Sequence, residues 1–248
     1  MIKLFKNIRR QLVNENKFGK YLRYAIGEII LVVVGILIAL WINQKANYNE
    51  ERNSEIAILI EIQSNLERDL IEINEDIAFM DSVNDGSHFI VHYLEHFDKP
   101  NSEFNHNVLK LRTTPHLNPN TSGYRLLVSK GVEIIQNDNL RQAISDHYES
   151  YYPYYLKYEQ ERIDFRIKYI ESELLKYFSW TATNHTLWLG EYRITDHDYT
   201  LLKNEGTFYK LTQATKRENN LVQNRALRIK QNMIDLLSLL AKELSTKI

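Results

Sequence analysis

The residues best suited to chemistry are three histidines that recur at every fourth position, His88, His92 and His96. On a helix they share one face, and two imidazoles at this spacing can bind a divalent metal ion. The stretch His92-Tyr-Leu-Glu-His96 also fits the H-x-x-E-H pattern of a class of zinc proteases. Such an enzyme needs a third ligand, which the sequence does not single out. The three histidines are therefore weak metal candidates, and a solvated helix face is the favoured interpretation.

No other catalytic pattern accompanies the histidines. The chain contains no Cys, which removes thiol catalysis and thiolate metal sites. It also contains no Gly-rich phosphate loop, nucleophile elbow, dinucleotide fingerprint or kinase motif. We therefore expect neither catalytic activity nor a cofactor.

A second group of interest is a run of tyrosines in the middle of the chain. Tyrosine provides a large amphipathic contact area at low entropic cost, which suits binding surfaces. We predict a partner-binding surface at Tyr151, Tyr152 and Tyr154. The alternative is that two or three of these tyrosines fill a helical core and the others line its wet edge.

An apolar stretch near the start of the chain, residues 25–42, contains a single charged residue, Glu28. As a helix it would span roughly 27 Å, close to the ~30 Å of a bilayer's hydrocarbon core. The apolar run exceeds the usual core of a cleaved signal peptide, and no small-x-small site follows it directly. The sequence therefore predicts an uncleaved transmembrane helix over residues 25–42.

Small residues form a stripe on this helix that could contact another membrane helix. Gly35 and Ala39 form a small-x-x-x-small pair, and Gly27 lies eight residues before Gly35. Glu28 either reaches the headgroup layer beside its own basic flank or contacts a polar group of a partner. We predict helix contacts at Gly27, Glu28, Gly35 and Ala39.

Charge predicts the orientation of the chain. Residues 1–24 carry seven Lys and Arg residues against Glu15 alone, and basic flanks mark the cytoplasmic side. We expect this amphipathic segment to lie in the cytoplasm, as a topogenic flank or on an anionic leaflet. Residues 43–248 would then form a periplasmic domain of a single-pass inner-membrane protein. The basic run is short, so no nucleic-acid partner is expected.

Beyond the membrane stretch, the hydrophobic pattern is helical. A heptad seam runs from Ile56 to Met80, with Gln63 as its one polar member. Apolar stripes recur over 155–178 and 207–244, which predicts an all-α fold: the transmembrane helix continues into an antiparallel helical bundle. The same seam spacing suits a packed core or an intermolecular coiled coil.

Local signals divide this domain further. We predict a break at 84–86, a short helix from Ser87 to Phe97 and a loop over 98–107. An irregular crossing over 113–122 should precede helices at 122–129 and 139–150. Pro153 should kink or restart the helix that precedes it, and residues 186–194 could form a hairpin.

The block Lys20-Tyr-Leu-Arg-Tyr-Ala-Ile-Gly-Glu-Ile-Ile-Leu-Val-Val-Val-Gly-Ile-Leu-Ile-Ala-Leu-Trp-Ile-Asn43 resembles the opening of a family of uncharacterised Bacteroidota membrane proteins. A second match begins at Thr121-Ser-Gly-Tyr124 and continues through the segment from Lys130 to Arg141 to about Tyr148. The resemblance implies a helical inner-membrane protein and supplies no activity, cofactor or catalytic residue.

Together these patterns predict a membrane-anchored periplasmic scaffold or interaction protein, oligomeric through its membrane helix and the seam. Its expected partners are the lipid bilayer and a second copy or another membrane protein. The alternative is a sensor-like ligand-binding bundle that acts through a partner, which a pocket with convergent polar groups would favour.

Overall fold

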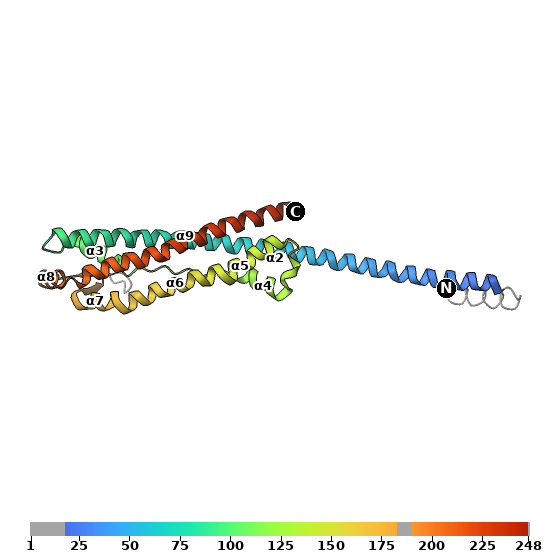
Figure 1. The fold of residues 1–248 in the computed structure, drawn as a ribbon, viewed down its shortest axis with the longest axis horizontal. Coiled ribbons are helices and arrows are strands. Elements are labelled where there is room, and N and C mark those ends of the chain that lie inside the picture. The colour runs from blue at the N-terminus through green and yellow to red at the C-terminus, as the bar shows by residue number, and fades with distance from the viewer. Residues whose placement is uncertain (1–17, 183–189, 248) are drawn as a thin grey trace. The chain divides into compact units, whose positions relative to one another are not determined.

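The computed structural model describes residues 18–182 and 190–247. It confirms the all-α prediction, with a long apolar N-terminal helix followed by shorter and longer helices (Figure 1). The α-helices are α2 (Phe18–His96), α3 (Ser102–Lys110), α4 (Ser122–Lys130), α5 (Asp138–Asp146), α6 (Tyr152–Phe165), α7 (Glu171–Tyr177), α8 (Asp196–Glu205) and α9 (Thr207–Lys247).

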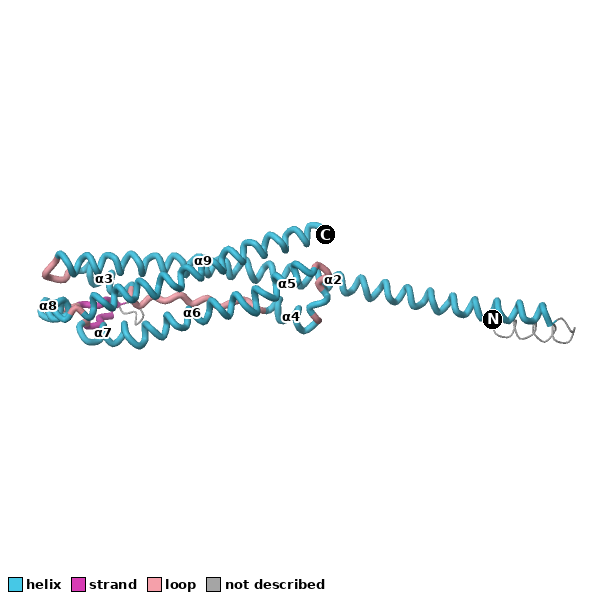
Figure 2. The backbone as a smooth tube through the Cα atoms, in the orientation of Figure 1, coloured by secondary structure: helices cyan, strands magenta, loops and turns pink. Residues whose placement is uncertain are grey.

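The chain divides into two compact units, Met1–Glu55 and Ile56–Ile248. In the described part of the first unit the backbone is all α2. In the second unit, the rest of α2 lies beside α9, which runs antiparallel to it, and α5–α7 complete the bundle (Figures 1 and 2).

The predicted seam forms part of the second unit's own core. Leu59, Leu66, Ile73 and Met80 are buried against α4, α5, α6 and α9. An aromatic cluster that includes Phe104, Tyr199 and Phe208 forms a second core between the end of α2, α3, α7, α8 and the start of α9. The seam is therefore a packed core within one chain, and it is covered without a second copy.

The predicted break at 84–86 is wrong, because α2 continues without interruption to His96. Gly86 serves a close approach instead of a turn: a Cβ there would lie 3.0 Å from Lys110 Cδ and 3.3 Å from the Asn107 carbonyl oxygen. Ser87 does not cap a new helix, since its hydroxyl donates to the Val83 carbonyl one turn earlier, at 2.7 Å. The missing Cβ thus lets α3 pack on α2.

The predicted loop over 98–107 is also partly wrong, because α3 begins at Ser102. Asn101 caps it, and its side-chain oxygen accepts from the Phe104 N–H at 2.7 Å. The crossing over 113–121 is confirmed as irregular chain. Helix α4 ends at Lys130 and is followed by Gly131, whose φ of 95° favours glycine.

Pro153 changes the helix around it without ending it. It occupies the first turn of α6, where a missing N–H is tolerated. The preceding residues, His147–Tyr151, form a π-helical turn, so the chain continues from α5 into α6. A second π turn, Arg166–Ile170, joins α6 to α7.

The hairpin differs from its predicted position. Strand β1 (Ser179–Ala182) pairs antiparallel with β2 (Gly190–Arg193), so that Ser179 faces Arg193. The second half of the predicted 186–194 segment is therefore β2, while residues 186–189 lie outside the described part of the chain. The first strand starts earlier than predicted.

Candidate functional site

The structure gathers no metal centre around the three histidines. All three are exposed on α2, and the rings of His92 and His96 lie 4.2 Å apart, with His96 Nδ1 bonded to the His92 carbonyl oxygen at 2.8 Å. Within residues 18–182 and 190–247, no group of three or more His, Asp or Glu side chains is placed to hold one ion.

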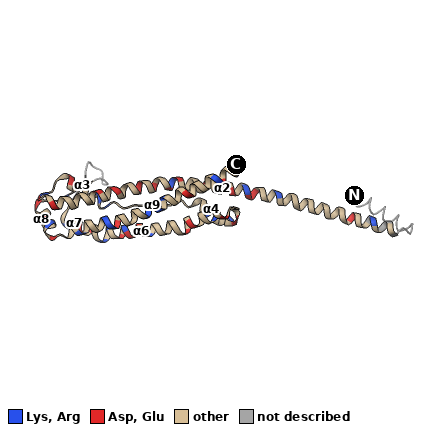
Figure 3. Cartoon of the chain, turned by 45° about the horizontal axis from the view of Figure 1, so that its top comes forward, with Lys and Arg blue, Asp and Glu red and all other residues tan. Residues whose placement is uncertain are grey.

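The apolar stretch of α2 is exposed at every position of 25–42 except Ala25 and Glu28, which are partly exposed. Its most apolar window has a mean hydropathy of 2.7, and this helix is long and apolar enough to cross a membrane. Gly27, Gly35 and Ala39 are exposed and Glu28 is partly exposed, and a Cβ at either glycine would meet no atom within 4 Å. In Figure 3 this part of α2 is almost entirely tan, with few charged residues, whereas the helices of the second unit carry many red and blue positions.

The predicted tyrosine surface is divided between two faces. Tyr151 and Tyr154 are 44% and 48% exposed, but Tyr152 is only 2% exposed, so its assignment to a partner surface is wrong. Successive helical residues are about 100° apart, and this rotation turns Tyr152 into the core. Its hydroxyl donates to the Asp69 carboxylate there.

Tyr151 and Tyr154 lie in a groove between α6 and α9 with a volume of about 470 Å³. We call it the tyrosine–arginine groove. It is lined by Tyr151, Tyr154, Tyr155, Arg225, Arg228, Ile229, Gln231, Asn232 and Asp235.

Arginine makes this groove cationic at one end. The Arg225 guanidinium lies 3.5 Å from the Tyr158 ring centroid and 5.9 Å from that of Tyr154, so two tyrosines hold it in place. Arg228 is exposed and has no ion-pair partner among the described residues. Asp235 accepts from Gln231 Nε2 at 2.9 Å and lies further along α9. This end can therefore bind an anionic group beside aromatic rings.

The floor of the groove connects with a buried polar network. Asn232 lines the groove, and its side-chain oxygen lies 2.5 Å from Nδ1 of the buried His147. The His147 ring packs against Tyr152, with ring centroids 4.3 Å apart, and Tyr152 donates to Asp69. Burial lowers the pKa of His147, because desolvation penalises the imidazolium.

The same network holds the irregular crossing in place. The prolines at 115 and 119 have no N–H, and every other backbone N–H from 116 to 120 donates to a carboxylate of α2 or α6. The pairs are His116 with Asp76 (3.1 Å), Leu117 with Glu159 (2.7 Å), Asn118 with Glu72 (3.1 Å) and Asn120 with Asp69 (3.0 Å). Carboxylate side chains thus accept the backbone hydrogen bonds that a neighbouring strand would accept in a β-sheet.

Burial shifts the pKa values of this cluster. Desolvation raises the pKa of Glu159 to about 7, against a smaller lowering by the Leu117 N–H. It also raises the pKa of Asp76. Arg162 is buried, and desolvation lowers its pKa to about 10 while one guanidinium nitrogen donates to the Leu111 and Thr113 carbonyls.

Sequence reasoning missed both arginines of the groove and the carboxylate cluster. Arg225 and Arg228 show no unusual spacing in the sequence. They line the groove only because α6 packs against α9, and the sequence does not show that packing. The carboxylates had a usable signal, since Asp69, Glu72 and Asp76 follow one face of α2 at helical spacing. That signal predicts a polar ridge on a helix, but not what binds to it.

The profile of one protein family, described as a family of unknown function (DUF6090), matches residues 28–203. The chain has no significant match to a curated protein or to a solved structure.

Proposed function

This chain belongs to DUF6090, a family of unknown function, and we propose that it is a membrane-anchored helical interaction protein without catalytic activity of its own. The tyrosine–arginine groove carries this proposal. It presents tyrosine and arginine together, which are the residues most enriched at binding hot spots.

The proposed setting is a bacterial inner membrane, crossed once. Support comes from the apolar 25–42 stretch, with its exposed side chains, and from the seven basic residues before it. The basic N-terminus lies in the cytoplasm and the helical bundle in the periplasm. There the groove faces other proteins of the cell envelope.

The proposed partner is a protein with an exposed acidic segment. Arg228 makes no ion pair with a residue that the structure describes, and Arg225 is already held against the Tyr158 ring, so neither guanidinium needs extensive reordering to accept a carboxylate. Tyr151 and Tyr154 offer exposed rings beside them.

Association between copies is proposed through the membrane helix alone. The seam is buried in the chain's own core, so it cannot pair without unfolding the bundle. The stripe of Gly27, Gly35 and Ala39 is open and lets a second helix approach closely in lipid.

The groove is tested by placing a photo-crosslinking amino acid at Tyr154 in living cells. We expect a discrete product with an envelope protein, and we expect Arg225→Ala with Arg228→Glu to abolish it. The matched control is Lys157→Glu on α6, which should leave the product unchanged. A product that persists in the double variant would refute a role for the groove.

The oligomer is tested by light scattering in mild detergent. Gly35→Leu should lower the mass toward that of a monomer, while Val33→Leu, on the opposite face of the helix, should not. A monomeric unsubstituted protein would contradict pairing through this helix and leave the groove proposal intact.

A further inference from the structure

The three exposed histidines near the end of α2 differ in how their rings are placed. The ring centroids of His92 and His96 lie 4.2 Å apart, whereas His88 makes no ring contact among the described residues. Both rings of the pair are open to solvent, and therefore to dissolved ions. Two imidazoles one helical turn apart can chelate a metal ion whose other ligands are water molecules. The pair is thus a smaller site than the three-ligand centre considered above.

One hydrogen bond of this pair leaves a nitrogen of His96 ready to bind a metal. Its Nδ1 lies 2.8 Å from the His92 carbonyl oxygen, which can only accept, so Nδ1 carries the proton. The lone pair of the neutral ring is then on Nε2, on the exposed side chain. A backbone carbonyl bonded to the other ring nitrogen is the usual arrangement that orients a metal-binding histidine and makes the binding nitrogen more basic.

The chemistry around the pair selects the class of ion. Imidazole nitrogen suits Cu²⁺, Ni²⁺ and Zn²⁺, whereas Mg²⁺ and Ca²⁺ require oxygen ligands. The neighbouring carboxylate of Glu95 accepts from the Tyr209 hydroxyl at 2.9 Å, and the described residues place no third His, Asp or Glu ligand beside the pair. Because water completes the coordination, the protein imposes no geometry on the ion. Affinity should then follow the Irving–Williams order, in which Cu²⁺ binds most tightly.

We propose that His92 and His96 form an exchangeable site for a divalent transition-metal ion, preferentially Cu²⁺. The site shares no residue with the tyrosine–arginine groove and does not depend on it. It also lacks the third protein ligand that a zinc protease requires, so its role is metal binding and not hydrolysis.

The test is isothermal titration of the untagged full chain in detergent with CuCl₂, ZnCl₂ and MgCl₂ in turn. We expect Cu²⁺ to bind in the micromolar range, Zn²⁺ to bind more weakly and Mg²⁺ not to bind. His92→Ala and His96→Ala should each weaken Cu²⁺ binding at least tenfold, because a single imidazole cannot chelate. Both positions are exposed on a helix, and alanine favours the helix, so both variants should keep the fold. Binding should also weaken as the pH is lowered to about 5, since only neutral imidazole binds metal.

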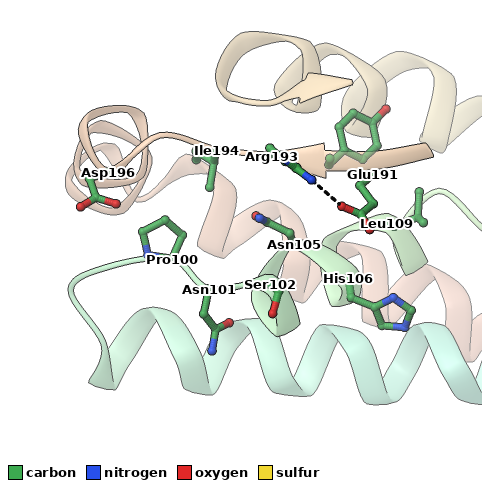
Figure 4. Close-up of a pocket in the computed structure, with 11 residues that line it drawn as sticks. Pro100, Asn101, Ser102, Asn105, His106, Leu109, Glu191, Arg193, Ile194 and Asp196 are labelled. Carbon is green, nitrogen blue, oxygen red and sulfur yellow. Dashed lines mark hydrogen bonds and ion pairs between the residues drawn. The ribbon is translucent and has the colours of Figure 1, made fainter. Parts of the chain in front are cut away.

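Two further histidine variants are the matched controls. His88→Ala removes the exposed histidine one turn earlier on α2, and His106→Ala removes an exposed histidine of α3 that lines a separate pocket between α3 and β2 (Figure 4). Both controls should bind Cu²⁺ like the unsubstituted protein. Unchanged binding in His92→Ala or His96→Ala, or an equal loss in either control, would overturn the assignment to this pair.

Discussion

Helix α2 contains two apolar stretches that have opposite surroundings. In residues 25–42 apolar side chains cover all sides of the helix and are exposed. In residues 56–80 those that recur at spacings of three and four form one stripe, which the chain itself covers. A helix that is apolar on all sides needs an apolar solvent, whereas a helix with one apolar stripe needs only a packed neighbour. The width of the apolar face therefore indicates what covers each stretch.

The largest expected effect is the loss of folding stability when a cavity is made in the buried stretch. Leu66 is fully buried, so Leu66→Ala should lower the free energy of unfolding by about 2–5 kcal/mol. Chemical denaturation of the full chain in detergent, followed by circular dichroism, measures it. Leu37→Ala makes the same truncation in the exposed stretch and should change this value little. If both variants lost the same free energy of unfolding, the two stretches would not differ in how the chain buries them.

A charge in the exposed stretch should act on membrane insertion instead. Val34→Arg places a cation near the centre of the apolar run, at a cost of about 2.5–3.5 kcal/mol for insertion. Carbonate extraction of membranes should then release a larger share of the variant than of the unsubstituted protein. Gln63→Arg, in the seam, is the control and should remain in the membrane. Full retention of Val34→Arg would argue against a spanning helix.

Glycines sharpen the same comparison. A Cβ at Gly123 would lie 2.8 Å from the Ile62 backbone nitrogen, so Gly123→Ala must move α4 away from α2. We expect it to destabilise the bundle by about 1–3 kcal/mol, the usual cost of overpacking. A Cβ at Gly35 would have no described atom within 4 Å, so Gly35→Ala should leave the midpoint of thermal unfolding unchanged. A stable Gly123→Ala variant would show that the contact between α2 and α4 adjusts freely.

The sequence predicts those elements whose signal lies within one helix. The seam at Leu59, Leu66 and Ile73 and the long helix α9 follow directly from hydrophobic spacing. Gly86 was misinterpreted because glycine marks both breaks and close contacts, and only the position of α3 distinguishes them. Local patterns cannot supply that position.

The groove and the carboxylate cluster depend on register between helices. Tyr154 and Arg225 are distant in the chain, and they meet only because α6 packs antiparallel to α9. Tyr152 points inward because the π turn before Pro153 sets the rotation of α6. These relations arise from tertiary packing. The tyrosine run therefore indicates a binding surface, but it does not indicate the arginines of α9 that complete the groove.

An effect no larger than that of Gly123→Ala is expected from a pH dependence confined to the buried cluster. The pKa of Glu159 rises on folding from 4.5 to about 7, so its protonated form favours the folded state. This stabilisation is complete below about pH 4.5 and is lost as the pH rises through 7, by roughly 1–3 kcal/mol. His147 acts in the opposite direction, because its pKa is lowered and folding loses stability as the imidazole becomes protonated.

The two contributions are separated by comparing the unsubstituted protein with Glu159→Gln at pH 5 and pH 8. Glutamine keeps an oxygen that can accept from the Leu117 N–H but does not titrate. We expect the variant to gain stability relative to the unsubstituted protein as the pH increases, because only the carboxyl must ionise inside the bundle. Parallel stability curves over this range would show that Glu159 ionises as it does in water, and that an ionised carboxylate accepts from the Leu117 N–H throughout this pH range.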